Sequence, residues 1–193
     1  MIRCLFKFAN NPYGGVEVDT TSGSGLWSGL SPFLLNVSKY GSKNFENLWQ
    51  YSKVYYPEHI DAWNNTPNAD WYLWRDKGWN SQKANRYPMG KGRKPRYSYW
   101  ESQKLTYVQA RKNIYAPIYA ELVQKTEAFK RLQSLYLSLY DDNKPLILRD
   151  YDAYDHIKEG KTLKQVINDP DRKCGHAFVL AMILTGKLEE CIK

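Results

Sequence analysis

The stretch KPLILRDYD, residues 144–152, places three consecutive aliphatic side chains ahead of a charged segment. A short apolar run that follows a proline and precedes turn-forming aspartates is typical of a buried strand. Carboxylates at the end of such a strand are often an acid, a base or a metal ligand. Asp150 and Asp152 are therefore candidate catalytic residues. Surface turn chemistry is the alternative, because Asp is a favoured turn residue.

Helical periodicity surrounds this strand. Between residues 103 and 140, apolar residues recur at steps of three and four, and Pro117 is expected to separate two helices. Beyond the strand, the pattern TLKQ at 162–165 resembles a capping box and predicts a short helix. A last helix is expected in a segment with Pro170 near its start and Gly186 near its end.

The first 25 residues have the pattern of strands. Apolar and polar residues alternate over residues 2–8, which predicts an opening strand and not a secretory signal. Turn residues and a second short strand then indicate a hairpin or strand pair. With 193 residues, of which 42% are apolar, the chain is long enough to bury a core. The predicted fold class is α+β, mainly helical with a small β-sheet, in a single domain over residues 1–193.

Positive charge is concentrated in one segment. Between Arg75 and Lys112 there are eleven Lys and Arg against two acidic residues, a balance of +9 compared with +8 for the whole chain. Basic side chains interleaved with Trp and Tyr suit a surface that neutralises phosphates and stacks bases. The predicted partner is nucleic acid, DNA in the first place, and a solubilising basic loop is the alternative. The predicted nucleic-acid-binding residues are Arg86, Lys91, Arg93, Lys94 and Arg96.

Several functional classes lack their sequence signals. The chain contains no P-loop, HExxH, GxSxG or zinc pattern, and its three histidines are scattered, so no metal or other cofactor is expected. The longest apolar run, residues 177–184, is too short for a membrane span. Three irregularly spaced cysteines predict buried free thiols and a cytoplasmic location. Cys174, two residues from His176, is an alternative nucleophile, although packing is the more ordinary role of such a pair.

The segment FENLWQYSK, residues 45–53, carries a polar stripe. Glu46, Gln50 and Lys53 stand at i, i+4 and i+7, on one face of a helix expected over roughly 44–56, with Asn44 as its N-cap. Apolar residues occupy the opposite face. The stripe is either a solvated surface with a Glu-to-Lys pair or one wall of a pocket.

The longer segment LSPFLLNVSKYGSKNFENLWQYSK, residues 30–53, resembles the opening motif of the NADAR (YbiA-like) N-glycosidase family. In that family a Leu-Ser-Asn-Phe-like turn precedes a helix that carries Glu, then aromatic-Gln, then Lys at this spacing. Residues 110–138 resemble the family's pair of helices, and CGHAFVLAMIL at 174–184 resembles its closing glycine-led helix. The chain looks like a divergent member with a basic aromatic insertion at about 57–104.

Departures from the family pattern bear on the substrate. The family's Trp-Gly-x-Gly stretch before the last helix is not recognisable, and Pro32 stands where Asn is usual. The basic aromatic insertion is foreign to the minimal pattern. These departures bear on the identity of the substrate more than on the fold.

The resemblance implies hydrolysis of an N-glycosidic bond, either in nucleotide-like metabolites or in ADP-ribose attached to nucleic-acid bases. The chemistry fits, because a carboxylate stabilises the oxocarbenium-like sugar and activates water. The candidate catalytic residues are Glu46, Asp150 and Asp152, and the candidate substrate-binding residues are Gln50, Lys53, Trp49 and Ser31. We expect a DNA glycosylase that excises a modified base, in a setting of antiphage defence. An ADP-ribosyl N-glycosidase and a non-catalytic nucleic-acid-binding module are the alternatives.

Overall fold

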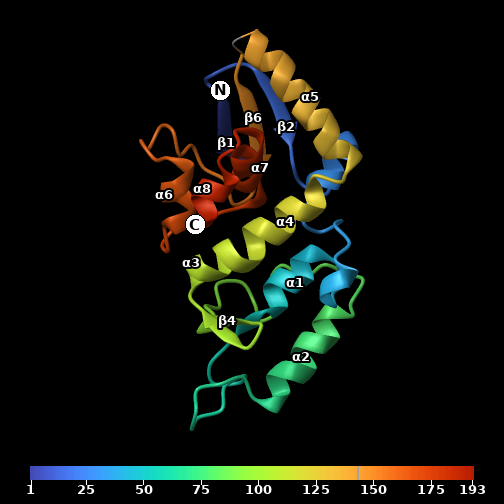
Figure 1. Cartoon of the computed structure of the whole chain (residues 1–193), viewed down its shortest axis with the longest axis vertical. Coiled ribbons are helices and arrows are strands. Elements are labelled where there is room, and N and C mark those ends of the chain that lie inside the picture. The colour runs from blue at the N-terminus through green and yellow to red at the C-terminus, as the bar shows by residue number, and fades with distance from the viewer. Residues whose placement is uncertain (143) are drawn as a thin grey trace.

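Two small β-sheets organise the chain, which the computed structural model describes over residues 1–142 and 144–193 (Figure 1). The strands are β1 (Ile2–Phe6), β2 (Val16–Asp19), β3 (Lys53–Val54), β4 (Tyr97–Trp100), β5 (Gln103–Leu105) and β6 (Leu146–Asp150). The α-helices are α1 (Phe45–Tyr51), α2 (Ala69–Trp79), α3 (Tyr107–Ala110), α4 (Ala116–Val123), α5 (Glu127–Asp141), α6 (Leu163–Asn168), α7 (His176–Leu184) and α8 (Leu188–Ile192). The predicted α+β class is confirmed.

The first sheet is parallel and has β6 in its middle. Both β1 and β2 pair with β6 in parallel, so the strand order is β1–β6–β2. Every residue of β6 is buried, which confirms the predicted buried strand. Of the hairpin or strand pair expected over residues 1–25, both strands are present, but their pairing with each other is wrong, because β1 and β2 each pair with β6. An apolar strand with two hydrogen-bonding edges accepts a partner on both sides, as buried parallel strands do.

The helix α7 packs against β1 and β6, and α4 crosses α7 between the two halves of the molecule (Figure 1). Residues 176–182 of α7 are all buried, in keeping with their continuous apolar sequence. Gly175 precedes the helix, and a Cβ there would lie 2.0 Å from Asp150 Oδ2. A glycine is therefore required where α7 meets the end of β6.

A buried arginine holds the segment that joins α6 to α7. Arg111, which is 1% exposed, donates hydrogen bonds to the carbonyls of Ile167 at 3.3 Å and Asp169 at 2.6 Å, and to that of Arg172. The Ile167 carbonyl lies at the end of α6, and the other two lie in the turn that follows this helix. Helix α7 begins at His176 and not near Pro170 as expected, and its predicted end before Gly186 is confirmed, although a further short helix, α8, follows.

A second core lies in the segment that joins α1 to α3. Strands β3, β4 and β5 form an antiparallel sheet, and Val54, Ile60, Trp71 and Tyr97 form an apolar cluster beside it. Without sustained periodicity, the sequence predicts a long structured loop with short helical turns over residues 60–100, which is wrong for β4 and for α2 with its eleven residues. Its aromatic residues are spread around the helix without a single apolar face, so periodicity did not reveal it.

The segment 103–140 is helical over most of its length, but it breaks at a different place. It begins with β5, and α3 continues through a π-helical turn at residues 111–115 into α4. Pro117 lies in the first turn of α4, directly after the π-helical turn, so the expected new start at this proline is confirmed, although no loop separates α4 from the helical turn before it. The break falls at residues 124–126, where Thr126 Oγ1 accepts the N–H of Phe129 at 3.1 Å in the first turn of α5.

The helix expected over 44–56 is shorter than its pattern. Asn44 caps α1 by accepting the N–H of Asn47 at 2.9 Å, and the helix ends at Tyr51. Lys53 already pairs with Ser98 of β4. Strand pairing in the second sheet thus replaces the last turn of the expected helix.

Three other sequence features have clear outcomes. The capping box at 162–165 is formed in both directions at the start of α6. All three cysteines are free and buried, as predicted. Within the described residues, no helix has the length and apolar character that a membrane crossing requires.

The close packing of α1 on α2 provides a test of the fold. A Cβ on Gly78 would lie 2.1 Å from the ring of Tyr51. We expect Gly78→Ala to lower the free energy of unfolding by about 1–3 kcal/mol, because overpacking outweighs the better helix propensity of alanine. Urea denaturation measures the change. Gly23→Ala is the control, since a Cβ there meets no atom within 4 Å. Equal stability of both variants would contradict this packing.

Candidate active site

Polar side chains gather at the edge where the three parallel strands end. Phe6, Asp19 and Asp150 are the last residues of β1, β2 and β6. Open parallel sheets bind ligands beyond the carboxyl ends of their strands. Lys7 joins two of these ends, because its Nζ donates to Thr21 Oγ1 at 2.7 Å and lies 3.1 Å from Asp19 Oδ2.

Asp150 organises this edge from a buried position. Its Oδ2 lies 3.2 Å from His176 Nδ1 and accepts the N–H of Ala177 at 3.4 Å. Its Oδ1 accepts the N–H of Asp152 at 3.3 Å. The other ring nitrogen of His176 lies 2.7 Å from the hydroxyl of Thr20. Asp150 is only 3% exposed, so the structure places it behind Asp152, where it orients the start of α7.

Asp152 is held between two cations. Its Oδ2 lies 2.5 Å from Arg86 Nη2, and its Oδ1 lies 3.0 Å from Lys173 Nζ. Burial favours the neutral carboxyl, but Arg86 and Lys173 outweigh this effect and lower the pKa of Asp152 below its usual value. Arg86 is one of the predicted nucleic-acid-binding residues, and the structure brings it to this carboxylate.

Glu46, Gln50 and Lys53 form a hydrogen-bonded line, referred to below as the polar line. Gln50 Nε2 donates to Glu46 Oε1 at 2.9 Å, and Lys53 Nζ donates to Gln50 Oε1 at 2.6 Å. The helix supplies only the first two residues, and β3 supplies Lys53. Glu46 and Gln50 are 5% and 9% exposed, so a solvated surface stripe is excluded.

Burial shifts the pKa values at the two ends of the polar line in opposite directions. It raises the pKa of the Glu46 carboxyl and lowers that of the Lys53 amine to about 8. The charges of Arg86 and Asp152 act on both groups. The polar line and the edge of the sheet therefore share one electrostatic environment.

Tyr115 connects the predicted catalytic residues, although the sequence did not single it out. Burial raises its pKa well above the usual value, and the charges of Asp150 and then Glu46 raise it further. It is the last residue of the π-helical turn before α4. Such turns often occur at functional sites, but no sequence pattern indicated this one. Glu46, Asp150 and Asp152 thus surround a common region of the protein.

The remaining predicted substrate-binding residues have supporting contacts. Trp49 is 7% exposed, and its ring lies 4.7 Å from Lys53 Nζ and 5.0 Å from the ring of Tyr115. Ser31 is buried, and its Oγ accepts the N–H of Phe33 at 3.3 Å. Trp49 therefore forms a wall behind the polar line, whereas Ser31 shapes the turn before α1.

The other predicted nucleic-acid-binding residues lie between α2 and β4. Arg93 is partly neutralised, because its Nη2 lies 2.7 Å from Glu58 Oε2. In the described part of the chain, Lys91, Lys94 and Arg96 form no ion pair and are exposed. These three side chains are therefore available to phosphates.

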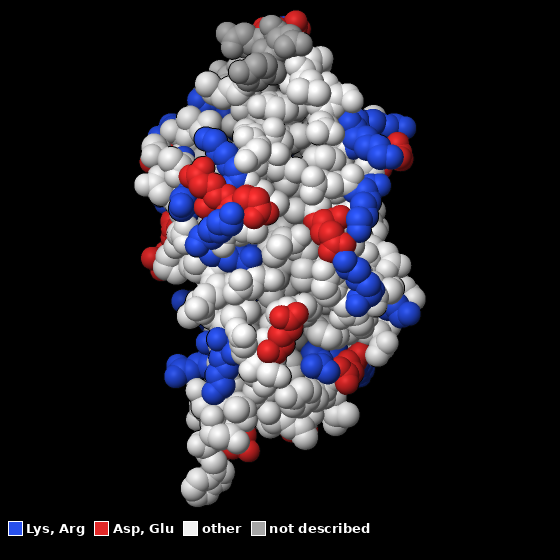
Figure 2. All heavy atoms as spheres, viewed as in Figure 1, with Lys and Arg blue, Asp and Glu red and all other residues white. Residues whose placement is uncertain are grey.

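An exposed loop lies beyond the second sheet. Residues 61–66 project at the lower end of the molecule (Figure 1), where Trp63 is 98% exposed. In the view of Figure 2 the tip of this projection is uncharged, and Lys and Arg side chains gather above it. An exposed ring beside positive charge is suited to stacking on a base.

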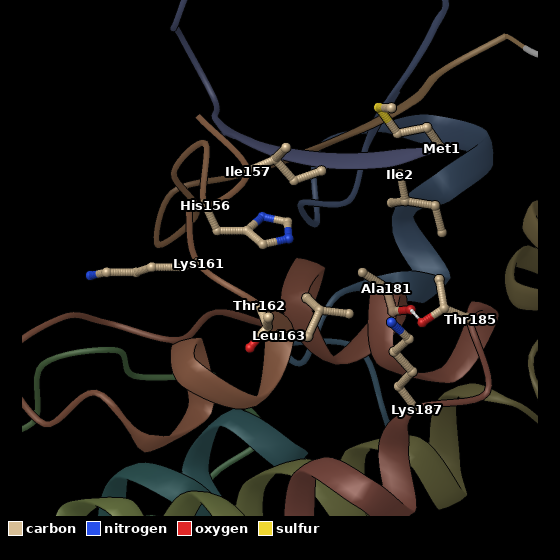
Figure 3. Close-up of a pocket in the computed structure, with 10 residues that line it drawn as sticks. All are labelled: Met1, Ile2, His156, Ile157, Lys161, Thr162, Leu163, Ala181, Thr185 and Lys187. Carbon is tan, nitrogen blue, oxygen red and sulfur yellow. Dashed lines mark hydrogen bonds between the residues drawn. The ribbon is translucent and has the colours of Figure 1, made fainter. Parts of the chain in front are cut away.

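Two pockets lie at opposite ends of the parallel sheet. An open pocket of about 270 Å³ adjoins the carboxyl edge and is lined by Tyr151, Asp152, Ala153, Tyr154, Asp171, Arg172 and Lys173. Another, of about 250 Å³, includes Met1 and Ile2 and so lies at the amino end of β1 (Figure 3). Figure 3 shows Lys161 of this second pocket pointing away from the other lining residues. Of these two pockets, only the first includes Asp152 among its lining residues.

The geometry gives little support to a metal centre or to a nucleophilic cysteine. Among the residues described, no group of three or more His, Cys, Asp and Glu is placed to hold a metal ion. Burial raises the pKa of the Cys174 thiol to about 12, which disfavours a nucleophilic thiolate. His176 contacts Asp150 and Thr20.

The buried amine of Lys53 makes stability depend on pH. Its pKa is about 8 in the folded protein and 10.5 ordinarily, so the unfolded chain binds more protons between these values. The free energy of unfolding of the wild type, minus that of Lys53→Met, should therefore rise between pH 8 and pH 10.5. Urea denaturation at several pH values measures this difference. A flat difference would show that the amine is not held in an apolar environment.

Comparisons of the chain with protein-family models, with curated proteins and with solved structures found no match. The geometry of the polar line and of the carboxyl edge is therefore the basis for assigning a function.

Proposed function

We propose that this protein hydrolyses an N-glycosidic bond in nucleic acid, with a modified base in DNA as its substrate. The observation that carries the proposal is a pair of carboxylates, Glu46 and Asp152, whose pKa values are shifted in opposite directions within one electrostatic environment. Environments that separate two carboxylates in this way favour distinct acid–base roles. The NADAR (YbiA-like) fold, implied by the resemblance over residues 30–53, belongs to the same proposal.

Each charged group has a role in the hydrolysis. Glu46, whose raised pKa makes it the stronger base, takes a proton from water as the oxygen attacks C1′ of the sugar. Asp152 remains ionised and stabilises the oxocarbenium-like transition state. The bond from C1′ to nitrogen breaks with its electron pair leaving on the base. The Lys53 ammonium protonates that nitrogen, and exchange with solvent restores Glu46 and Lys53.

The surface beyond the site supports nucleic acid as the substrate. Lys91, Lys94 and Arg96 are exposed and available to phosphates, and Trp63 offers an almost fully exposed ring. An enzyme that acts on a base in duplex DNA must draw the nucleotide out of the stack, which cations and stacking rings assist.

One specific observation favours a second candidate, an ADP-ribosyl N-glycosidase. Arg172 and Lys173 line the open pocket beside Asp152, and two such cations suit a diphosphate. Release of free ADP-ribose from modified guanine, in place of a free base from DNA, would favour this candidate. A non-catalytic binding module would release neither product.

Replacement of Glu46 tests the chemical step. Glu46→Gln keeps the shape of the side chain and removes its charge, so single-turnover base release should fall by about 10² to 10⁴. Mass spectrometry of the small products detects release. Glu127→Gln is the control, because Glu127 is exposed on α5. Full activity in Glu46→Gln would refute the assigned role, whereas a lowered melting temperature would assign the loss to folding.

Neutralisation of the free cations tests the substrate surface. Combined replacement of Lys91, Lys94 and Arg96 by Gln should flatten the salt dependence of DNA binding by about one unit of log–log slope per lost phosphate contact. Fluorescence anisotropy at several salt concentrations measures the slope. The charge-matched control replaces Lys125, Lys130 and Lys144, which pair with Glu121 of α4, Glu127 of α5 and Asp142 just after α5. Equal slopes in both triple variants would exclude this surface as the DNA-binding face.

A further inference from the structure

Three exposed aromatic rings contact one another at the carboxyl edge of the parallel sheet. Phe6 ends β1 and is 43% exposed, Phe8 follows at 71%, and Tyr151, directly after β6, is 41% exposed. The ring centroid of Phe8 lies 5.7 Å from that of Phe6 and 5.9 Å from that of Tyr151, with edge-to-face geometry in both pairs. A single exposed apolar side chain is ordinary, but contiguous rings make a patch that indicates binding.

The backbone that carries these rings is fixed. The N–H of Lys7 donates to the Asp150 carbonyl at 3.0 Å, and that of Ala9 donates to the Phe6 carbonyl at 2.9 Å. Arg149, with a side chain only 8% exposed, donates to the carbonyls of Phe6 at 3.1 Å and Ala9 at 2.5 Å. A buried guanidinium therefore holds the turn that presents the rings, so a ligand meets a preorganised surface.

Cations flank the rings on the side of the candidate active site. Lys7 Nζ lies 5.0 Å from the centroid of the Tyr151 ring, and the guanidinium carbon of Arg86 lies 5.4 Å from it. Arg86 also binds Asp152, so the aromatic patch adjoins the proposed catalytic carboxylate. A planar ring joined to an anionic group satisfies both features, because the ring stacks on the exposed aromatic side chains, of which Phe8 is the most exposed, while the anion meets the cations.

From these contacts we infer that Phe6, Phe8 and Tyr151 form a stacking platform for a nucleobase, with Lys7 and Arg86 placed for the phosphate of the same nucleotide. The inference rests on the proposed function for the position of the reacting sugar. The inference adds that the site recognises the planar base together with its phosphate. The sugar phosphate alone is not sufficient. The cations on its border favour a nucleotide over an apolar partner such as a lipid or a protein surface.

Binding to small ligands tests the platform without requiring turnover. The probes are the four common deoxynucleoside 5′-monophosphates and 2′-deoxyribose 5-phosphate, titrated by calorimetry into the full chain. Phe8→Ala should weaken nucleotide binding by roughly 5- to 140-fold, the range for loss of one base–aromatic stack. Phe8→Trp should retain affinity because it keeps an aromatic face. Leu137→Ala, which removes an exposed apolar side chain from α5, should have no effect. Binding of deoxyribose phosphate should be the same in every variant.

The outcomes separate the platform from the proposed hydrolysis. Nucleotide binding that depends on Phe8, in a wild-type protein that releases no base from DNA, would support the platform and refute the hydrolase. Base release that is unchanged by Phe8→Ala, together with unchanged nucleotide affinity, would refute the platform alone. The inference would also be overturned if the wild-type chain bound none of the four nucleotides. The same holds if the chain bound lipid vesicles or a protein more tightly than the nucleotides, and if that binding depended on Phe8.

Discussion

The parallel pairing of β1 and β2 with β6 is the constraint on which the rest of the structure depends. Because the three strands run in the same direction, the residues that follow them meet at one edge. This geometry brings Lys7 to Thr21 and sets Tyr151 beside Phe8. It also places the Asp150 carboxylate at the start of α7. At position 175 only glycine fits without a clash with this carboxylate.

The candidate site combines this edge with groups from the other half of the molecule. The helix α1 and strand β3 supply the polar line, and the segment after α2 supplies Arg86. Burial then determines the chemistry, since desolvation raises the pKa of Glu46 and lowers that of Lys53, while two cations keep Asp152 ionised. The basic segment therefore has two roles in the proposal, because Arg86 lies beside Asp152 and Tyr151 within the candidate site, whereas Lys91, Lys94 and Arg96 are exposed to the phosphates of a longer strand.

Local signals were reliable where a residue acts on its own neighbours in the chain. Asn44 caps α1, the capping box at 162–165 starts α6, and the apolar run before Asp150 is a buried strand. The same signals failed where a distant segment competes for the backbone. Pairing with Ser98 ends the helix expected to include Lys53, and Arg111 holds the carbonyls that were expected to start the last helix. The helix α2 was missed because its rings lack one apolar face.

The sequence by itself determined the α+β class, the buried strand that ends in acid, and the association of Glu46, Gln50 and Lys53. These features depend on composition, on short-range periodicity and on spacing within nine residues. Only the tertiary structure decided that β6 lies between β1 and β2, that Arg86 binds Asp152, and that the charges of Asp150 and Glu46 act on Tyr115. Each of these depends on segments far apart in the chain, and their proximity is set by the burial of a shared core and not by any local pattern.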